Sequence, residues 1–261
     1  MPTNLIMDFK KYNNLVDLFF EQCQIQSKDK IFLSTLKDPK KNYSWDDVRI
    51  KVLKLANEIS KIIKKGDRCL LISENRPEWM ISDLSIMLAG GITVPAYTTY
   101  VSRDYEYIIN DCTPSVILVS NDDQFKKIKS ICERNSSIKK IFSYEKLTEV
   151  DDNAYLNIEN IFQNNENIEM NLTSNASRSD PACIIYTSGT QGNPKGVILS
   201  HGGILSNCEG GYALLKPILE KETRFLTWLP LSHSYEHAVQ FIQIAVAAKV
   251  FYAEGIDKLI K

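Results

Sequence analysis

The chain has 261 residues, of which 44% are hydrophobic and 24% are charged, and its formal net charge is −1. This balance is typical of a soluble globular protein with one large or two small domains, and it gives no reason to expect a nucleic-acid partner. No uncharged apolar stretch approaches the ~18 residues of a membrane-spanning helix, and the N-terminal residues lack the apolar core of a signal peptide. We therefore expect a cytoplasmic protein.

Strand-like and helix-like patterns alternate from residue 43 to residue 144. Residues 43–66 have helical spacing of apolar side chains, with Ser44 and Asp47 placed as a capping box and Gly66 as a stop. Beyond them, strands are predicted at 68–73, 92–95, 115–120 and 138–144, and helices at 77–91, 102–112 and 121–135. This alternation predicts an α/β fold with mostly parallel sheets and helices layered on their faces.

Residues 145–180 interrupt this rhythm because they are rich in Asn, Ser, Asp and Glu, and we expect a polar connection with one short helix near residues 158–162. The pattern then resumes. Strands are predicted at 182–188, 196–200, 224–230 and 250–254, and helices at 201–216 and 237–249.

A glycine- and hydroxyl-rich stretch, YTSGTQGNPKGV at residues 186–197, joins the strands predicted at 182–188 and 196–200. Glycines let backbone N–H groups approach an anion, hydroxyls donate to phosphate oxygens or bind Mg²⁺, and a lysine adds a mobile positive charge. The alternative is a flexible surface loop, but such a loop rarely combines these residues with Pro-Lys-Gly between two apolar strands. The stretch therefore predicts a polyphosphate-binding loop.

This loop belongs to neither of the two common phosphate-binding patterns. Counted from Gly189 as G-x-x-x-x-G-K-[ST], the sixth position is Pro194 and the eighth is Gly196, and an apolar strand rather than a helix follows. The dinucleotide pattern G-x-G-x-x-G is absent.

The stretch resembles the signature Y-T-S-G-T-T-G-x-P-K-G of the adenylate-forming enzymes, the acyl-CoA synthetase family in its wide sense, with Gln191 in place of the second Thr of the TT pair. Two more segments agree with that family. GDRCLLISENRPEWMISDLSIMLAGGITVPAYTT, at residues 66–99, and FLTWLPLSHSYEH, at residues 225–237, resemble segments of its long-chain fatty acid branch, the second through its L-P-L-x-H pattern.

The resemblance implies a two-step reaction in which ATP converts a fatty acid to an acyl-adenylate and coenzyme A then takes the acyl group. By resemblance, the phosphate-binding residues are Thr187, Ser188, Gly189, Thr190, Gln191, Gly192 and Lys195. Thr187 would also touch Mg²⁺. His233 would lie beside the reacting carboxylate and the α-phosphate, and together with Lys195 it is the expected catalytic residue.

The implied partners are the fatty acid, ATP and coenzyme A. A lipid substrate leaves peripheral association with the inner membrane surface open, whereas the acyl chain length and the oligomeric state cannot be inferred from the sequence.

The resemblance also implies a domain organisation. Residues 1–261 would be the front part of a large N-terminal AMP-binding domain, with a first α/β portion at 1–150, a polar connection at 151–180 and a phosphate-loop portion at 181–261. The small C-terminal domain of the family would be absent. Two hypotheses follow: the chain is a piece of a fatty acid–CoA ligase, or it is a complete, non-catalytic nucleotide-binding module. Both predict that the chain alone makes no acyl-CoA.

HSYEH, at residues 233–237, supports a remote alternative, because H-x-x-E-H is the pattern of inverted zinc peptidases. His233 and His237 would share a helix face and bind one Zn²⁺. Such a site needs a third ligand, and Glu254 is the sole Glu after His237.

Overall fold

The computed structural model describes residues 7–36, 38, 41–148, 154–164, 172–187, 194–219 and 222–253. Its helices are α1 (Leu15–Ile25), α2 (Trp45–Ser60), α3 (Pro77–Leu88), α4 (Ser102–Cys112), α5 (Asp122–Arg134), α6 (Ile158–Gln163), α7 (His201–Leu215) and α8 (Ser234–Ala245). Its strands are β1 (Ile31–Thr35), β2 (Asn42–Ser44), β3 (Arg68–Ile72), β4 (Ile92–Ala96), β5 (Val116–Val119), β6 (Lys140–Ser143), β7 (Tyr155–Asn157), β8 (Pro181–Thr187), β9 (Lys195–Ser200), β10 (Arg224–Thr227) and β11 (Lys249–Tyr252). Within these residues, no helix combines the length and the apolar character that crossing a bilayer requires.

The larger of two sheets has seven strands in the order β7-β6-β5-β3-β4-β8-β9. The strands from β7 to β8 run parallel, whereas β9 pairs antiparallel with β8. The smaller sheet has the order β10-β11-β1-β2, with β11 parallel to both β10 and β1. The predicted mostly parallel α/β fold is therefore confirmed.

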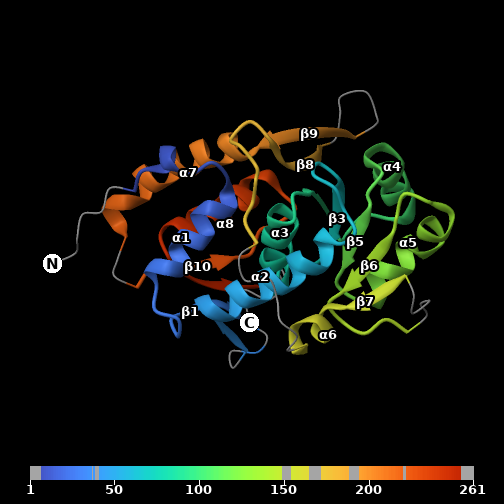
Figure 1. The fold of residues 1–261 in the computed structure, drawn as a ribbon, viewed down its shortest axis with the longest axis horizontal. Helices are drawn as coiled ribbons and strands as arrows, with labels where there is room; N and C mark the ends of the chain where they lie inside the picture. The colour runs from blue at the N-terminus through green and yellow to red at the C-terminus, as the bar shows by residue number, and fades with distance from the viewer. Residues whose placement is uncertain are drawn as a thin grey trace.

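The helices form layers around these sheets (Figure 1). Helices α4 and α5 pack on one face of the large sheet through a separate apolar cluster. The other face shares one continuous core with the smaller sheet, in which Leu71 and Leu118 of the large sheet join Phe32 and Val250 of the small one. Helix α3 lies in this middle layer, and all of its residues are buried.

Local sequence signals explain where the predicted helices begin and end. The capping box of α2 forms as predicted, because the Ser44 hydroxyl accepts from the Asp47 N–H and the Asp47 carboxylate accepts from the Ser44 N–H. Gly66 follows with φ of +86°, a conformation that favours glycine. Helix α3 starts at Pro77, whose fixed φ suits the first helical position.

Two regions contain more structure than predicted. The polar stretch expected to be a connection holds the predicted short helix, α6, but also strand β7, which extends the large sheet beside β6. Strand β7 has three half-buried residues, too few for a periodic signal. No element is predicted before residue 43, yet α1 and β1 lie there and β2 begins at Asn42. Strand β1 pairs in parallel with β11, which is near the other end of the chain.

Candidate functional site

The predicted phosphate loop is the tip of a β-hairpin. Strands β8 and β9 pair antiparallel, and their last described pair sets Thr187 directly opposite Lys195. The structure therefore brings these two predicted residues together at the mouth of the loop. Both are exposed. The remaining predicted phosphate-binding residues, Ser188, Gly189, Thr190, Gln191 and Gly192, lie outside the described residues.

Helix α4 holds this hairpin in place. The Tyr107 hydroxyl donates to the Pro194 carbonyl at 3.0 Å, just before β9 begins. The Tyr186 hydroxyl donates to the carboxylate of Asp111. Burial and the Asp111 carboxylate raise the pKa of Tyr186 above its usual value, so the phenol stays protonated and continues to donate. The only sequence signal for these contacts was the i,i+4 spacing of Tyr107 and Asp111, which puts them on one helix face.

Gly196 is required by packing across the hairpin. A Cβ at this position would lie 2.8 Å from Ile184 Cγ2 and 3.3 Å from Tyr186 Cζ. Because a Cβ would displace Ile184 and crowd Tyr186, the glycine after Lys195 supports the packing of the two strands.

Lys195 is available to bind an anion. Its side chain is exposed, and it makes no ion pair within the part of the chain that the structure describes. An ammonium across the hairpin mouth from the Thr187 hydroxyl is suited to phosphate oxygens, which accept hydrogen bonds from both groups.

His233 is the N-cap of α8. Its Nδ1 accepts from the Tyr235 N–H at 3.2 Å, which places the proton of the neutral ring on Nε2. The side chain is exposed, so Nε2–H is free to donate to an oxygen of a bound molecule.

Asn75, in the loop after β3, fixes the segment that leads to His233. Its side-chain amide donates to the Leu229 carbonyl at 2.7 Å and accepts from the Leu231 N–H at 3.0 Å. These two bonds set the position of the L-P-L segment against the large sheet. Nothing in the sequence pairs Asn75 with residues so far along the chain.

A buried polar network joins α3, α8 and β8. His237 Nε2 donates to Asp83 Oδ2 at 2.8 Å, and the Gln240 amide donates to the same oxygen at 3.0 Å. His237 Nδ1 lies 3.5 Å from Cys183 Sγ in the middle of β8. Burial alone would lower the pKa of His237, but the Asp83 carboxylate outweighs it and raises that pKa well above 6.5. His237 is therefore a buried imidazolium that ties the helix bearing His233 to the strand bearing Thr187.

The geometry argues against the zinc interpretation of HSYEH. His233 is exposed and caps α8 with its Nδ1, whereas His237 is fully buried and uses its ring nitrogens on Asp83 and Cys183. No group of three His, Cys, Asp or Glu side chains suited to a metal ion exists among the residues described.

Glu236, in the first turn of α8, should make the stability of the protein depend on pH. Burial raises its pKa to about 7. The folded protein then holds a proton that the unfolded chain releases near pH 4.5, so stability falls as the pH rises from 4.5 to 7. We expect Glu236→Gln to leave the free energy of unfolding unchanged at pH 4 and to raise it by roughly 2–3 kcal/mol at pH 8. Urea unfolding at both pH values measures this. The exposed Glu209→Gln serves as control and should change stability at neither pH; equal effects of the two variants would contradict the expectation.

The fold and the hairpin define an α/β protein with two sheets, in which a glycine-rich loop joins the last two strands of the larger sheet. The sequence pattern of the family described as AMP-binding enzyme matches residues 19–261. The chain therefore belongs to the AMP-binding enzyme family, which confirms the resemblance inferred from the loop.

Characterised relatives point to the long-chain branch. The chain is 30% identical over 233 residues to fatty acyl-CoA synthetase A of Dictyostelium discoideum, covering 82% of this chain and 33% of that protein. It is also 30% identical over 234 residues to long chain acyl-CoA synthetase 3 of Arabidopsis thaliana, covering 84% and 35%. The chain thus spans about a third of the length of these relatives.

Solved structures share the fold. The anthranilate CoA ligase AuaEII in complex with anthranoyl-AMP superposes with a TM-score of 0.79 at 22% identity, covering 95% of this chain and 47% of that one. ATP-bound MatB from Rhodopseudomonas palustris gives a TM-score of 0.77 at 20% identity, with coverage of 95% and 47%.

Proposed function

We propose that the protein containing this chain activates a long-chain fatty acid with ATP. A carboxylate oxygen of the acid attacks the α-phosphorus of ATP. The bond between that phosphorus and the oxygen that bridges it to the β-phosphorus breaks, and pyrophosphate is released. The thiolate of coenzyme A, formed when the thiol gives up its proton to water, then attacks the acyl carbon, and AMP leaves with the former carboxylate oxygen. The observation that carries the proposal is the pairing of Thr187 with Lys195 at the mouth of the signature loop. The relatives named as fatty acyl-CoA synthetases support the substrate class.

In this proposal the chain contributes positioning and charge. Lys195 neutralises charge on the β- and γ-phosphates, and the glycines and hydroxyl residues in the sequence 188–192 are of the types that bind phosphate. Thr187 offers an exposed hydroxyl oxygen, a donor type that suits Mg²⁺ when phosphate oxygens supply the other ligands. When bound, Mg²⁺ would add further positive charge beside the phosphates.

His233 is assigned to the reacting centre. Its Nε2–H would donate to an oxygen of the acid or of the α-phosphate, where negative charge is shared in the transition state. The two hydrogen bonds between Asn75 and the preceding L-P-L segment fix the position from which His233 extends. Residues 1–261 are proposed to be the front part of the large N-terminal domain, divided at 150 and 180, with the remaining groups supplied by sequence outside this chain.

The test is acid-dependent exchange of labelled pyrophosphate into ATP by the intact gene product, followed by thioester formation with coenzyme A. We expect palmitate to drive exchange and coenzyme A to convert the adenylate to palmitoyl-CoA. The isolated 261-residue chain should make no thioester. ATP binding by the intact product without acid-dependent exchange would instead favour a non-catalytic nucleotide-binding module. Rapid thioester formation by the isolated chain would contradict the assignment of these residues as one part of the domain.

A further inference from the structure

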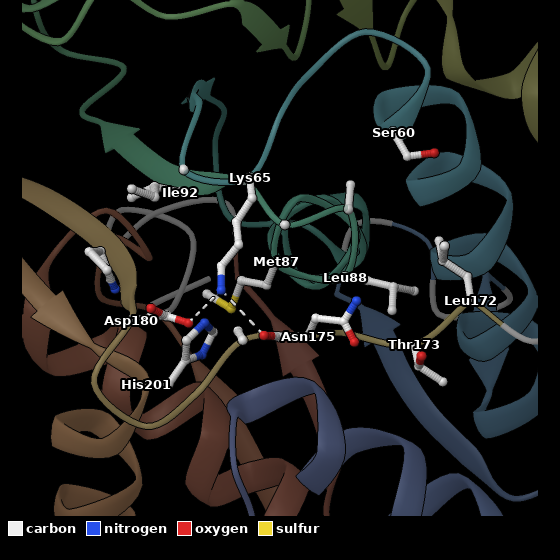
Figure 2. Close-up of a pocket in the computed structure, with 16 residues that line it drawn as sticks. Ser60, Lys65, Met87, Leu88, Ile92, Leu172, Thr173, Asn175, Asp180 and His201 are labelled. Carbon is white, nitrogen blue, oxygen red and sulfur yellow. Dashed lines mark hydrogen bonds and ion pairs between the residues drawn. The ribbon is translucent and has the colours of Figure 1, made fainter.

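A cavity of about 560 Å³ lies at the end of the large sheet opposite the phosphate loop. It is enclosed by the ends of α2 and α3 and by the starts of β4, β8 and α7 (Figure 2). Strand β8 begins in the cavity wall at Pro181 and ends at Thr187, so the two sites are roughly 20 Å apart at 3.3 Å per residue. The cavity is therefore separate from the proposed site of ATP chemistry.

One end of the cavity is polar. Lys65 Nζ donates to Asp180 Oδ2 at 2.9 Å and to the Asn175 carbonyl at 3.3 Å, as Figure 2 shows. An ammonium has three N–H groups, so one remains for another acceptor. The Lys65 charge is balanced by Asp180, which leaves this end of the cavity neutral overall.

His201 contributes a second hydrogen-bond donor to the cavity. It lines the cavity and is only 2% exposed. Its Nδ1 accepts from the Leu15 N–H at 3.4 Å, which puts the ring proton on Nε2, and within the described ranges Nε2 has no hydrogen-bond partner. Burial lowers the pKa of His201 to about 4, so the ring is neutral at pH 7. A ligand oxygen in the cavity would give this N–H an acceptor.

The rest of the cavity wall is mostly apolar. Met87, Leu88, Ile92 and Leu172 contribute side chains to it. The C-terminal end of α3, which carries the negative end of the helix dipole, also faces this space. That end disfavours an anion, while the donors Lys65 and His201 disfavour a ligand head group that has only N–H donors.

We propose that this cavity is a binding site for an uncharged amphiphile. The carbonyl oxygen of the ligand accepts from His201 Nε2–H and from Lys65, and its apolar chain lies along Met87, Leu88 and Leu172. The cavity volume is in the range of small-molecule pockets, and a mainly apolar wall with a few convergent polar groups is their usual composition. The proposal is independent of the reaction assigned to the phosphate loop.

Three six-carbon probes that differ in their head groups test this proposal: hexanamide, hexanoate and hexylammonium. The readout is the pair of ring ¹⁵N chemical shifts assigned to His201, one of three histidines in the 261 residues of this chain. We expect a saturable shift with hexanamide, roughly five-fold weaker binding of hexanoate, because its negative charge meets the C-terminal end of α3, and no shift with hexylammonium. Saturating ATP should not displace hexanamide. Tighter binding of hexanoate, absence of a His201 shift, or displacement by ATP would each overturn the proposal.

A matched pair of lysine variants tests the role of Lys65. Lys65→Met keeps the aliphatic stem and removes the ammonium, and we expect roughly five-fold weaker hexanamide binding. Lys64→Met removes an exposed neighbouring charge that does not line the cavity, and binding should be unchanged. Equal affinities of the two variants would remove Lys65 from the site. If Lys65→Met does not fold, the three probes on the unaltered protein still decide the outcome.

Discussion

Replacing Lys195 with Ala is expected to slow acid-dependent ATP–pyrophosphate exchange by the intact protein roughly 10²–10³-fold, the usual effect of removing one group that stabilises developing charge. Lys195 is exposed, lies opposite Thr187 at the loop mouth and makes no ion pair among the residues that the structure describes. Its ammonium is therefore free for phosphate oxygens. Because it is exposed, the substitution should leave the free energy of unfolding within about 0.5 kcal/mol of the original value.

Two further variants sharpen this expectation. Lys195→Arg keeps the charge but changes its shape and donor geometry, so exchange should be partly retained. Lys64→Ala removes an exposed lysine that has no place in the phosphate loop, and exchange should stay unchanged. A Lys195→Ala protein that is folded and as active as the Lys64→Ala protein would remove Lys195 from the catalytic assignment.

Replacing His237 with Ala is expected to lower the free energy of unfolding by about 3–5 kcal/mol, because it leaves the Asp83 carboxylate buried without its cation. Both side chains are fully buried, and the Gln240 amide alone would remain on Asp83 Oδ2. The folded-state pKa of His237 is raised above 6.5, so its stabilisation is fully present below that pH and is lost as the pH rises through the folded-state value. The difference between the two proteins in urea unfolding should therefore be largest near pH 6 and shrink in the alkaline range.

Two comparisons separate the loss of the charge pair from general damage to α8. His233→Ala removes only the side-chain cap of the same helix and should cost about 1 kcal/mol. Adding Asp83→Leu to His237→Ala removes the uncompensated carboxylate, and part of the lost stability should return. If His237→Ala costs no more than His233→Ala, or if its effect does not change with pH, the Asp83–His237 pair does not stabilise the fold.

The network around His237 also connects the two parts of the proposed site. His237 lies one helical turn after His233 and contacts Cys183, on the strand that ends at Thr187. Asn75 adds a second connection, from the loop after β3 to the segment before His233. Strand β8 and His233, which come from different parts of the fold, are thus each anchored to the core between the two sheets.

Local patterns in the sequence were sufficient for much of the fold and for the chemistry of the loop. The capping box at Ser44, the proline at the start of α3 and the glycine after α2 act through neighbouring backbone atoms, so their effect can be predicted from adjacent residues. The hydroxyls, glycines and lysine of the loop have the same donor chemistry in any fold. Short elements such as β7 lacked enough residues for a periodic signal.

The sequence by itself determined the order of most helices and strands, the family, and the residue types that make up the phosphate loop. Only the tertiary structure decided that β9 turns back on β8 to place Lys195 opposite Thr187, and that His237 meets Asp83 across 154 residues of chain. It alone placed His201 and Lys65 at one cavity. The physical reason is that hydrogen bonds and ion pairs depend on distance in space, and the distances between these residues are set by how the two sheets and the helices between them pack, not by their spacing in the chain.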